Sequence, residues 1–472
     1  MPSLPSTLQD HNAMQVKTKV QRLIAGNGLA LCLAVPGAAL ATDLSEIYEL
    51  SREYDTVIAT ARHQLEAAEQ QLPIARSARR PQIELGGGAS LNRLDALTVD
   101  DYNENTLSLS ASQSLYNGAT NKLVDQAEVR VEQAKAQYAA QEQNLILRAA
   151  EAYFNVLSAE AELEFRESEL EAIRRQRVQA ERRFDVGLVP VTDVRAAQAQ
   201  YDLAVAQRVV AENAVQSARE ALRVISGVDS ATNLARLAGD LPLNRPEPED
   251  VEQWVEVALN RNLDVVVAEL ALKDAELQTD YERATGRPTL AAIASGGLID
   301  TDQEGRVDAE QGSIGLKLDM PLYTGGRIKA QIANARAQAL ASEESLGTQI
   351  LATTQETRNA YRGVLASISQ VEALRQALRS TRKSYEAIDA GYRAGTRTSV
   401  EVLEALRDTY QAKSNYSSAR YNYILNSLNL KASSGTLTEK DLYHFNGFLV
   451  EDKDKDKDKD KDKDKDDGNE EN

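Results

Sequence analysis

The sequence predicts a membrane protein of mixed α and β type, in which a small β-barrel continues into a long α-helical coiled-coil tunnel. Three observations support this fold class: an export leader, an internal repeat, and strand segments that alternate apolar and polar residues. Aromatic residues make up only 5% of the 472 residues, so a thick globular core is not expected. The formal charge of −18 argues against binding to nucleic acid, which requires a basic face.

The N-terminus has the pattern of a secretory signal peptide. Basic residues precede an apolar run at 23–33, and Pro36 and a small-residue cleavage site follow the run. A transmembrane anchor is the weaker alternative, because a membrane-spanning helix needs roughly 20 apolar residues. Met1 and Met14 both fit as the start of this leader. The mature chain is therefore expected to be exported.

The mature chain offers few residues for chemistry. The single cysteine, Cys32, lies inside the leader, which leaves no thiol for a disulfide, a nucleophile or a metal site. The two remaining histidines, His63 and His444, are far apart in the sequence and remote from any pair of carboxylates. We expect no cofactor, no bound metal and no enzymatic activity.

Short motifs recur at nearly constant spacing along the mature chain. Leu-Tyr-Asn-Gly at 115–118 recurs as Leu-Tyr-Thr-Gly 207 residues later. Arg80-Pro81 also recurs after 207 residues, and Ala152-Tyr153 recurs after 208. Several matches in one register predict a tandem duplication of one structural unit.

The repeat divides the chain into six expected parts. They are a signal peptide (1–41), a first repeat (42–226), an inter-repeat equatorial region (227–260), a second repeat (261–432), a C-terminal equatorial segment (433–450) and a disordered Asp/Lys tail (451–472). The equatorial segments are expected to form a lateral collar. The tail alternates Asp and Lys with no apolar residue to bury, so it is given no fold.

Each unit is predicted to contain a helix, two strands, a very long helix, a turn and a further helix. The opening helices, at 44–78 and 263–284, end near an Arg-Pro pair, because the residue before proline disfavours helical backbone. After the strands, about 67 residues lack proline, at 120–186 and at 327–394. At ~1.5 Å per residue, such a helix is on the order of 100 Å long. A glycine-containing turn then reverses the chain into a helical hairpin.

The four strand segments predict a membrane barrel. Apolar and polar residues alternate in three of them, as at Ile314, Leu316 and Leu318, whereas the segment 288–301 alternates poorly. Such stretches of about ten residues are typical of outer-membrane barrels, although a soluble sheet with one wet face shows the same alternation. Because even small membrane barrels need about eight strands and open edges are unstable in lipid, several chains are expected to share one barrel.

Motifs near both turns and in the last helix are specific in combination. They are Phe184-Asp185-Val186-Gly187-Leu188, Thr192-Asp193-Val194, Ala390-Gly391-Tyr392, Gly395-Thr396-Arg397-Thr398, Ala419-Arg420-Tyr421-Asn422-Tyr423, and Leu428-Asn429-Leu430-Lys431 with Gly435-Thr436-Leu437. Together with the duplication, they resemble the TolC-type outer-membrane efflux family, over the mature chain to about Leu449. The resemblance implies a homotrimer in the cell outer membrane, with four strands from each protomer in a twelve-stranded barrel above a periplasmic helical tunnel.

The resemblance also implies partners and a function. Family members contact outer-membrane lipid and dock, through a periplasmic adaptor protein, onto an inner-membrane pump of ABC, RND or MFS type. They passively conduct drugs or secreted polypeptides to the exterior in tripartite efflux and type I secretion. A trimeric coiled-coil surface adhesin or structural protein is the alternative, but adhesins end in their barrel and carry no duplicated strand pairs inside the chain.

By the same resemblance, the inner hairpin closes the tunnel at its periplasmic end and is held there by hydrogen bonds and salt bridges. Tyr392 and Arg397 of the second hairpin are the expected latch side chains. Thr192 and Asp193 of the first hairpin are their expected partners. Breaking these contacts is expected to open the tunnel.

Two further residues of the second hairpin are expected to line the aperture. Glu401 and Glu404 stand where family members commonly have two aspartates. They are three residues apart and share a helix face, so threefold symmetry would gather six carboxylates around one axis. Like charges so close raise one another's pKa and attract cations, which predicts a cation-selective mouth. An ordinary solvated helix face is the alternative.

The two turns differ at equivalent positions of the repeat. At an offset of 208 residues, Tyr392 corresponds to Phe184 and Arg397 to Val189, so only the second hairpin carries a phenol and a cation. This asymmetry predicts that the second hairpin latches and releases. The turn residues themselves are the expected contacts of the adaptor: Val186, Gly187, Leu188, Ala394, Gly395 and Thr396.

Overall fold

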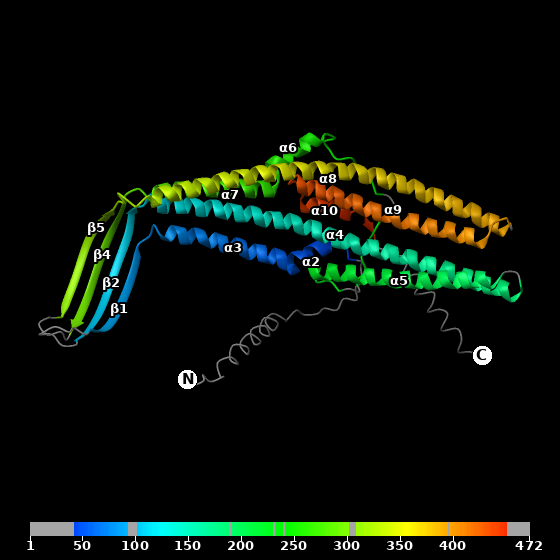
Figure 1. The fold of residues 1–472 in the computed structure, drawn as a ribbon, viewed down its shortest axis with the longest axis horizontal. Coiled ribbons are helices and arrows are strands. Elements are labelled where there is room, and N and C mark those ends of the chain that lie inside the picture. Colours follow the sequence, from blue (N-terminus) through cyan, green and yellow to red (C-terminus); the bar gives the residue numbers. More distant parts are fainter. Residues whose placement is uncertain are drawn as a thin grey trace, which may run out of the picture. The chain divides into compact units, whose positions relative to one another are not determined.

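A computed structural model describes most of the mature chain (Figure 1). The described residues are 42–92, 102–187, 190–229, 232–238, 241–301, 308–394 and 396–450. The predicted signal peptide and the Asp/Lys tail lie outside them, as do the side chains of Asp193, Ser399 and Leu403.

The two halves of the chain contain long elements in the same order. The first half has α2 (Leu44–Tyr54), α3 (Thr56–Ser77), β1 (Gln82–Asn92), β2 (Tyr102–Tyr116), α4 (Gly118–Asp185) and α5 (Val191–Ser226). The second has α6 (Val251–Arg261), α7 (Leu263–Ala284), β4 (Thr289–Thr301), β5 (Ala309–Asp319), α8 (Arg327–Arg393) and α9 (Ser399–Ser433). The short β3 (Arg236–Leu237), α10 (Glu439–Asn446) and β6 (Leu449–Val450) complete the described chain.

The two longest helices lie where the proline-free stretches predict them. Helix α4 has 68 residues and α8 has 67. Helix α5 packs along α4 and α9 packs along α8, so each long helix forms a hairpin with its successor. In Figure 1 the two hairpin turns lie at the ends of these helices that are remote from the sheet. No helix in the described ranges is both long enough and apolar enough to cross a membrane.

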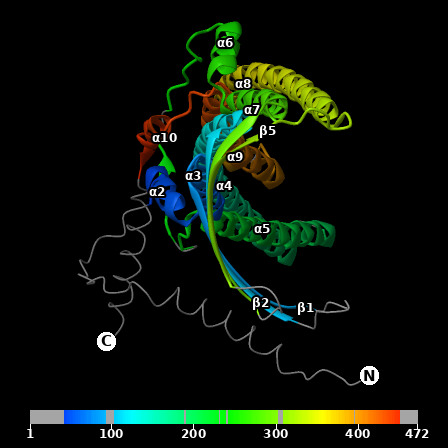
Figure 2. The ribbon, with the colours of Figure 1, turned by 90° about the vertical axis from the view of Figure 1, so that its left-hand side faces the viewer.

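The four long strands form one antiparallel sheet in the order β1-β2-β4-β5. Residues that face each other across neighbouring strands share a face of the sheet. Leu85 lies opposite Leu109, and Leu107 lies opposite Leu298, so one face is apolar across the strands. This face is open to the surroundings in the single chain, as the 92% exposure of Ile314 illustrates. Figure 2 shows the four strands as a curved strip.

The register explains why the segment 288–301 alternates poorly. Ile293 lies opposite Ser112, and Ile299 lies opposite Thr106, so both isoleucines fall on the polar face. Serines and charged residues of the other strands lie on the same face, as at Lys317. Two large apolar residues on this mostly polar face interrupt the alternation in the segment.

The single helix predicted over residues 44–78 is wrong, because the chain breaks at Asp55 into α2 and α3. The backbone of Asp55 is extended, with φ −65° and ψ 120°, and its side chain accepts hydrogen bonds from the amides of Val57 and Ile58 at 2.8 and 2.9 Å. Asp55 is therefore the N-cap of α3, and a cap residue has non-helical backbone.

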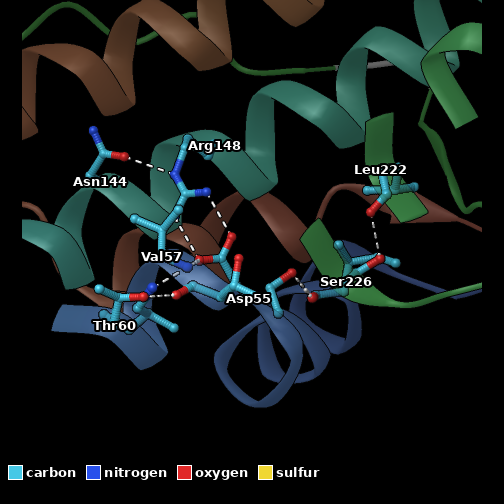
Figure 3. A network of polar contacts seen from close by, with 11 residues as sticks. Asp55, Val57, Thr60, Asn144, Arg148, Leu222 and Ser226 are labelled. Atoms are coloured by element: carbon cyan, nitrogen blue, oxygen red, sulfur yellow. Dashed lines mark hydrogen bonds and ion pairs between the residues drawn. The ribbon is translucent and has the colours of Figure 1, made fainter. Parts of the chain in front are cut away.

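A buried ion pair holds this break against the long helix α4 (Figure 3). Asp55 is only 4% exposed, and both of its carboxylate oxygens accept hydrogen bonds from Arg148, at 2.7 and 3.1 Å. Arg148 is itself oriented by Asn144, one turn earlier on α4, at 2.9 Å. A buried carboxylate requires such partners, because an unpaired charge is strongly disfavoured in an apolar surrounding.

The second half has the same kind of break 207 residues later, at Asn262 between α6 and α7. The φ and ψ angles of Asn262 are −62° and 126°, and its side chain caps the amides of Asp264 and Val265. Its amide nitrogen donates to the carbonyl of Ser433 at 3.0 Å. A neutral amide thus occupies the position that the first half gives to a paired carboxylate.

Each break is contacted by a glycine that follows the last helix of its half. Gly227 and Gly435 have φ of +70° and +67°, the left-handed conformation that favours glycine. A Cβ atom on Gly227 would lie 2.7 Å from the ring of Tyr54, and one on Gly435 would lie 2.2 Å from the carbonyl oxygen of Arg261. The helix ends therefore approach the breaks too closely for any side chain.

The main hydrophobic core surrounds the middle of α4. Tyr153 and Phe154 of α4 are almost completely buried there, in one cluster with Leu44 of α2 and Ile424 of α9. The Tyr153 hydroxyl donates to the carbonyl of Ala235 at 2.6 Å, beside the point where β3 pairs with β6. The segment between the halves and the C-terminal segment thus meet at the same level as this core.

Gly435→Ala should destabilise the protein because it adds a Cβ atom against backbone in a left-handed conformation. We expect a loss of about 2 kcal/mol in the free energy of unfolding, measured by thermal unfolding of the detergent-solubilised protein. Gly347→Ala is the matched control, since a Cβ there meets nothing within 4 Å inside α8. In that control the free energy of unfolding should rise by about 0.5–1 kcal/mol. Equal losses in both variants would contradict the close approach at Gly435.

The Asp55–Arg148 pair should make stability depend on pH. Burial acts to raise the pKa of Asp55, but the hydrogen bonds from Arg148 and from the amides of Ile58 and Val57 outweigh it and hold this pKa below its usual value. Such a group stabilises the fold above its unfolded pKa of about 3.9 and loses this contribution as the pH falls through the folded value. Asp55→Asn should lower the free energy of unfolding by about 2 kcal/mol at neutral pH. This difference from wild type should shrink below about pH 4.

The control for this change is Asp125→Asn, which removes an exposed carboxylate paired with Lys122 on the surface of α4. It should lower the free energy of unfolding by well under 1 kcal/mol at any pH, because exposed ion pairs contribute little to stability. Unfolding midpoints measured between pH 3 and pH 7 compare the two variants. A pH-independent difference between Asp55→Asn and wild type would show that the carboxylate charge is not what matters.

Candidate functional site

The first hairpin turn joins α4 to α5 through a left-handed glycine. Gly187 has φ +74°, and its amide donates to the carbonyl of Phe184 at 2.8 Å. Val186 is 68% exposed, and Pro190 precedes the first residue of α5. Val186 and Gly187, two of the predicted adaptor contacts, are therefore exposed at the turn. Leu188 lies outside the described residues.

The second turn, between α8 and α9, is stabilised by hydrogen bonds to the end of α8. The amide and the hydroxyl of Thr396 both donate to the carbonyl of Gly391, at 2.9 and 3.0 Å. A Cβ atom on Gly391 would lie 2.8 Å from Cγ of Arg397, so the chain folds tightly back on the helix end. Ala394 and Thr396 are exposed, and Gly395 is outside the part of the chain that the structure describes.

A hydrogen bond links the two hairpins near their turns. The side-chain amide of Gln179, on α4, donates to the hydroxyl of Tyr392, on α8. The two residues are 213 positions apart in the chain. Tyr392, one of the predicted latch residues, is therefore engaged with the first hairpin inside the same protomer.

The predicted partners of the latch lie on the first turn of α5. Thr192 is exposed there, and Asp193 is placed as a helical residue. The contact of Tyr392 that the structure shows is with Gln179, and the pairing with Thr192 and Asp193 stays a prediction.

Gln179 was not predicted from the sequence, although the repeat contains a signal for it. At an offset of 208 residues, Gln179 corresponds to Ala387, just as Tyr392 corresponds to Phe184. Both partners of the observed hydrogen bond are thus polar where the other copy is apolar. A search of the repeat for paired differences of this kind would have found Gln179.

The start of α9 is held by a capping box. The carboxylate of Glu401 accepts from the amide of Thr398 at 2.7 Å and from its hydroxyl at 3.0 Å, and the Thr398 hydroxyl accepts from the Glu401 amide at 3.3 Å. Arg397 donates from Nη1 to the other carboxylate oxygen of Glu401 at 2.9 Å. The hydrogen bonds from the Thr398 amide and from Arg397 hold the pKa of Glu401 below its usual value.

Glu404 lies one turn further along α9 and is exposed. It borders a cleft between α9 and the first hairpin, which is lined by residues of three helices. The lining includes Glu169 of α4, Gln207 of α5, and Val400, Glu404 and Arg407 of α9. The structure therefore places the two predicted ring glutamates on one helix but in different surroundings.

Further contacts between the hairpins lie on the core side of Gln179. Ser414 donates to Glu162 and Lys413 donates to Glu164, both at 2.9 Å, which joins α9 to α4. Phe165 packs near Tyr410 with ring centroids 6.5 Å apart. The second hairpin is thus attached to the first by ionic and aromatic contacts as well as by the bond near the turn.

Known proteins that are similar to this chain share both its sequence pattern and its fold. The pattern of the family described as "Outer membrane efflux protein" matches residues 47–228 and again residues 254–436. The chain belongs to this family. It is 35% identical to outer membrane protein TolC of Vibrio cholerae, over 87% of this chain and 95% of the relative.

Another relative and a solved structure are also similar to this chain. The chain is 25% identical to the alkaline protease secretion protein AprF of Pseudomonas aeruginosa, over 88% of each protein. The crystal structure of the Campylobacter jejuni CmeC outer membrane channel superposes with a TM-score of 0.74, at 16% identity, over 89% of this chain and 94% of that one. The latter likeness establishes the fold of an outer membrane channel.

Membership in the family settles several predictions. The chain is an outer-membrane protein whose helical tunnel lies in the periplasm, and it serves as an exit duct. The family consists of channels, which confirms that the chain is not an enzyme. The adhesin alternative is unsupported by these relatives.

Proposed function

We propose that three copies of this chain form one twelve-stranded barrel that continues into a periplasmic helical tunnel. The observation that carries this proposal is the apolar face of the sheet, which is open in the single chain. Strands β1 and β5 are the outer strands of the sheet, and strand edges must be paired in lipid. Four strands per chain satisfy this requirement only if neighbouring chains supply the missing pairs.

The proposed protomer is a tandem duplication. Two separate matches to one family pattern and the same element order in both halves support it. The equivalent breaks at Asp55 and Asn262 support it further. The proposed parts keep the boundaries drawn from the sequence: leader 1–41, repeats 42–226 and 261–432, equatorial segments 227–260 and 433–450, and tail 451–472.

The proposed duct receives its cargo from an inner-membrane pump of ABC, RND or MFS type through a periplasmic adaptor. Drugs or secreted polypeptides then pass to the exterior without further energy input. The family description names efflux, and the name of the Pseudomonas relative names protease secretion, which supports both classes of cargo. The exposed turn residues Val186, Gly187, Ala394 and Thr396 are the proposed adaptor contacts, together with Leu188 and Gly395.

The proposed gate is the link between the two hairpins near their turns. Gln179 and Tyr392 form its intramolecular part. Arg397 is proposed to complete the latch against Thr192 and Asp193 in the assembled trimer. Opening then requires the second hairpin to leave the first. Glu401 and Glu404, at the start of α9, are the proposed acidic residues of the aperture.

Weakening the latch should open the channel. Loss of one hydrogen bond worth about 0.5–1.5 kcal/mol shifts the ratio of open to closed channels by about two- to tenfold. We therefore expect Tyr392→Phe and Gln179→Ala to raise the mean conductance in planar lipid bilayers and the entry of antibiotics into cells. Wild-type protein should form channels of lower mean conductance in the same bilayers.

Tyr385→Phe is the matched control for the latch, because Tyr385 lies two turns earlier on α8. It should behave as wild type in both assays. Conductance and antibiotic entry that stay at wild-type values in both latch variants would remove the Gln179–Tyr392 bond from the mechanism. Wild-type protein that never conducts would contradict the duct itself.

A further inference from the structure

The long helices of one chain lie side by side in an order that leaves two of them at the flanks. Between the core and the turns, α5 packs along α4, α4 contacts α9, and α9 packs along α8. Figure 2 shows α5 and α8 on opposite flanks, with α4 and α9 between them. Each of these two flanking helices therefore has one long side that its own hairpin does not cover.

Helix α5 carries two apolar faces at the same spacing. One face is buried, as at Ala204 and Ala211, which are seven residues apart. The other face is open: Leu203, Val210 and Val224 stand seven or fourteen residues apart, and each is at least 63% exposed. Small residues between them share this open face: Ala199, Ala206 and Ser217. Apolar residues at heptad spacing form the contact face of a coiled coil, so the open face of α5 is shaped for a second helix.

The uncovered side of α8 has a complementary shape. Its residues are small, exposed and seven positions apart: Ala366, Ala373, Ser380 and Ala387. Val371 is buried in the hydrophobic core, and at ~100° per residue Ala373 lies on nearly the opposite side of the helix. Small side chains leave hollows that receive the larger side chains of a facing helix. Leucine and valine stand on the open face of α5, and alanine and serine stand on that of α8.

The two open faces also lie at the same height. Val210 is 19 residues from the start of α5 at Val191, and Ala373 is 20 residues from the end of α8 at Arg393. Both of these helix ends lie at the turns, and the two helices run in opposite directions (Figure 1). At ~1.5 Å per residue, Val210 and Ala373 are therefore nearly level.

Opposite charges flank the two faces at one height. Asp202 precedes Leu203 and is 11 residues from the start of α5, and Lys383 is 10 residues from the end of α8. Both side chains are exposed, and the partner of Asp202 on its own helix is the neutral amide of Gln198, at 2.8 Å. Charges that flank a coiled-coil face select the partner helix and its orientation.

We propose that α5 of one chain packs antiparallel against α8 of the next chain, with Val210 facing Ala373 and Asp202 beside Lys383. The partner is a second copy, because one chain carries both faces on opposite flanks, and a head-to-tail contact of this kind closes into a ring. The contact continues the junction of the proposed barrel, since outer strand β5 leads into α8. It rests on that proposed barrel and identifies the helix faces that join its copies.

Cross-linking of paired cysteines tests this contact, since the only cysteine of the chain, Cys32, lies in the predicted leader. Val210→Cys together with Ala373→Cys should link neighbouring chains when outer membranes are treated with a mild oxidant. A disulfide requires Cα atoms about 4.4–6.8 Å apart, so a link reports direct packing. Non-reducing gels should show species of two and three chains, and reduction should return them to one chain.

Two controls accompany the facing pair. Each single-cysteine variant should stay at the mass of one chain. Val210→Cys with Ala387→Cys uses the same two faces but is shifted by 14 residues, which is on the order of 20 Å along the helix, and should link far less. Facing cysteines that stay unlinked in particles of three chains, that link within one chain, or that link less than the shifted pair would overturn the proposal.

Charge reversal tests the same contact without cysteines. Asp202→Lys and Lys383→Asp should each lower the temperature at which the particle separates into single chains by about 2–4 °C, because each replaces an exposed attraction by a repulsion. The double variant should return to the wild-type temperature. Single variants without a shift, or a double variant that loses as much as both singles together, would contradict the pairing of Asp202 with Lys383.

These outcomes are separable from a failure of the proposed barrel. Wild-type particles that contain one chain contradict the shared barrel itself. Wild-type particles of three chains, together with facing cysteines that never link, contradict only the contact between α5 and α8.

Discussion

The alternation of apolar and polar residues across four strands is the constraint on which the rest of this protein depends. The register brings leucines such as Leu85, Leu107 and Leu109 onto one face, which a single chain leaves open. Such a face is stable only against lipid or another apolar surface. The outer strands impose a second requirement, since their backbone groups need partners wherever water is excluded. One chain can meet neither requirement alone, which supports the proposal that several chains share one barrel.

The middle of the long helices is where the protein buries most of its large apolar side chains. Rods of 67 and 68 residues bury only narrow stripes, and the chain therefore concentrates its large apolar side chains at one level. Helix ends lie at this level in both halves. They are produced by the helix breaks at Asp55 and Asn262, and the glycines at 227 and 435 allow the last helix of each half to end against them. One break uses a carboxylate paired with arginine, and the other uses a neutral amide. The two halves thus share a geometry while differing in charge.

Features that depend on neighbouring residues were predictable from the sequence, whereas features that depend on distant residues were not. The long helices follow from proline-free stretches, and the faces of the strands follow from alternation with a period of two. The break at Asp55 was missed because a helix continuing through an aspartate is locally reasonable. What favours the break is Arg148, 93 residues away. Gln179 was missed for the same reason, since Tyr392 lies 213 residues later. The capping role of Glu401 was readable locally, as Thr398 stands three positions before it.

Several chains are proposed to complete one barrel. The most direct test is the native mass of the particle extracted from outer membranes in mild detergent, measured together with its channel activity. A barrel shared by three chains predicts a particle of three chains that conducts after reconstitution, and no conducting particle of smaller mass. A single chain that is inserted in the membrane and conducts by itself would contradict a shared barrel, because four strands would then have closed a barrel without partners.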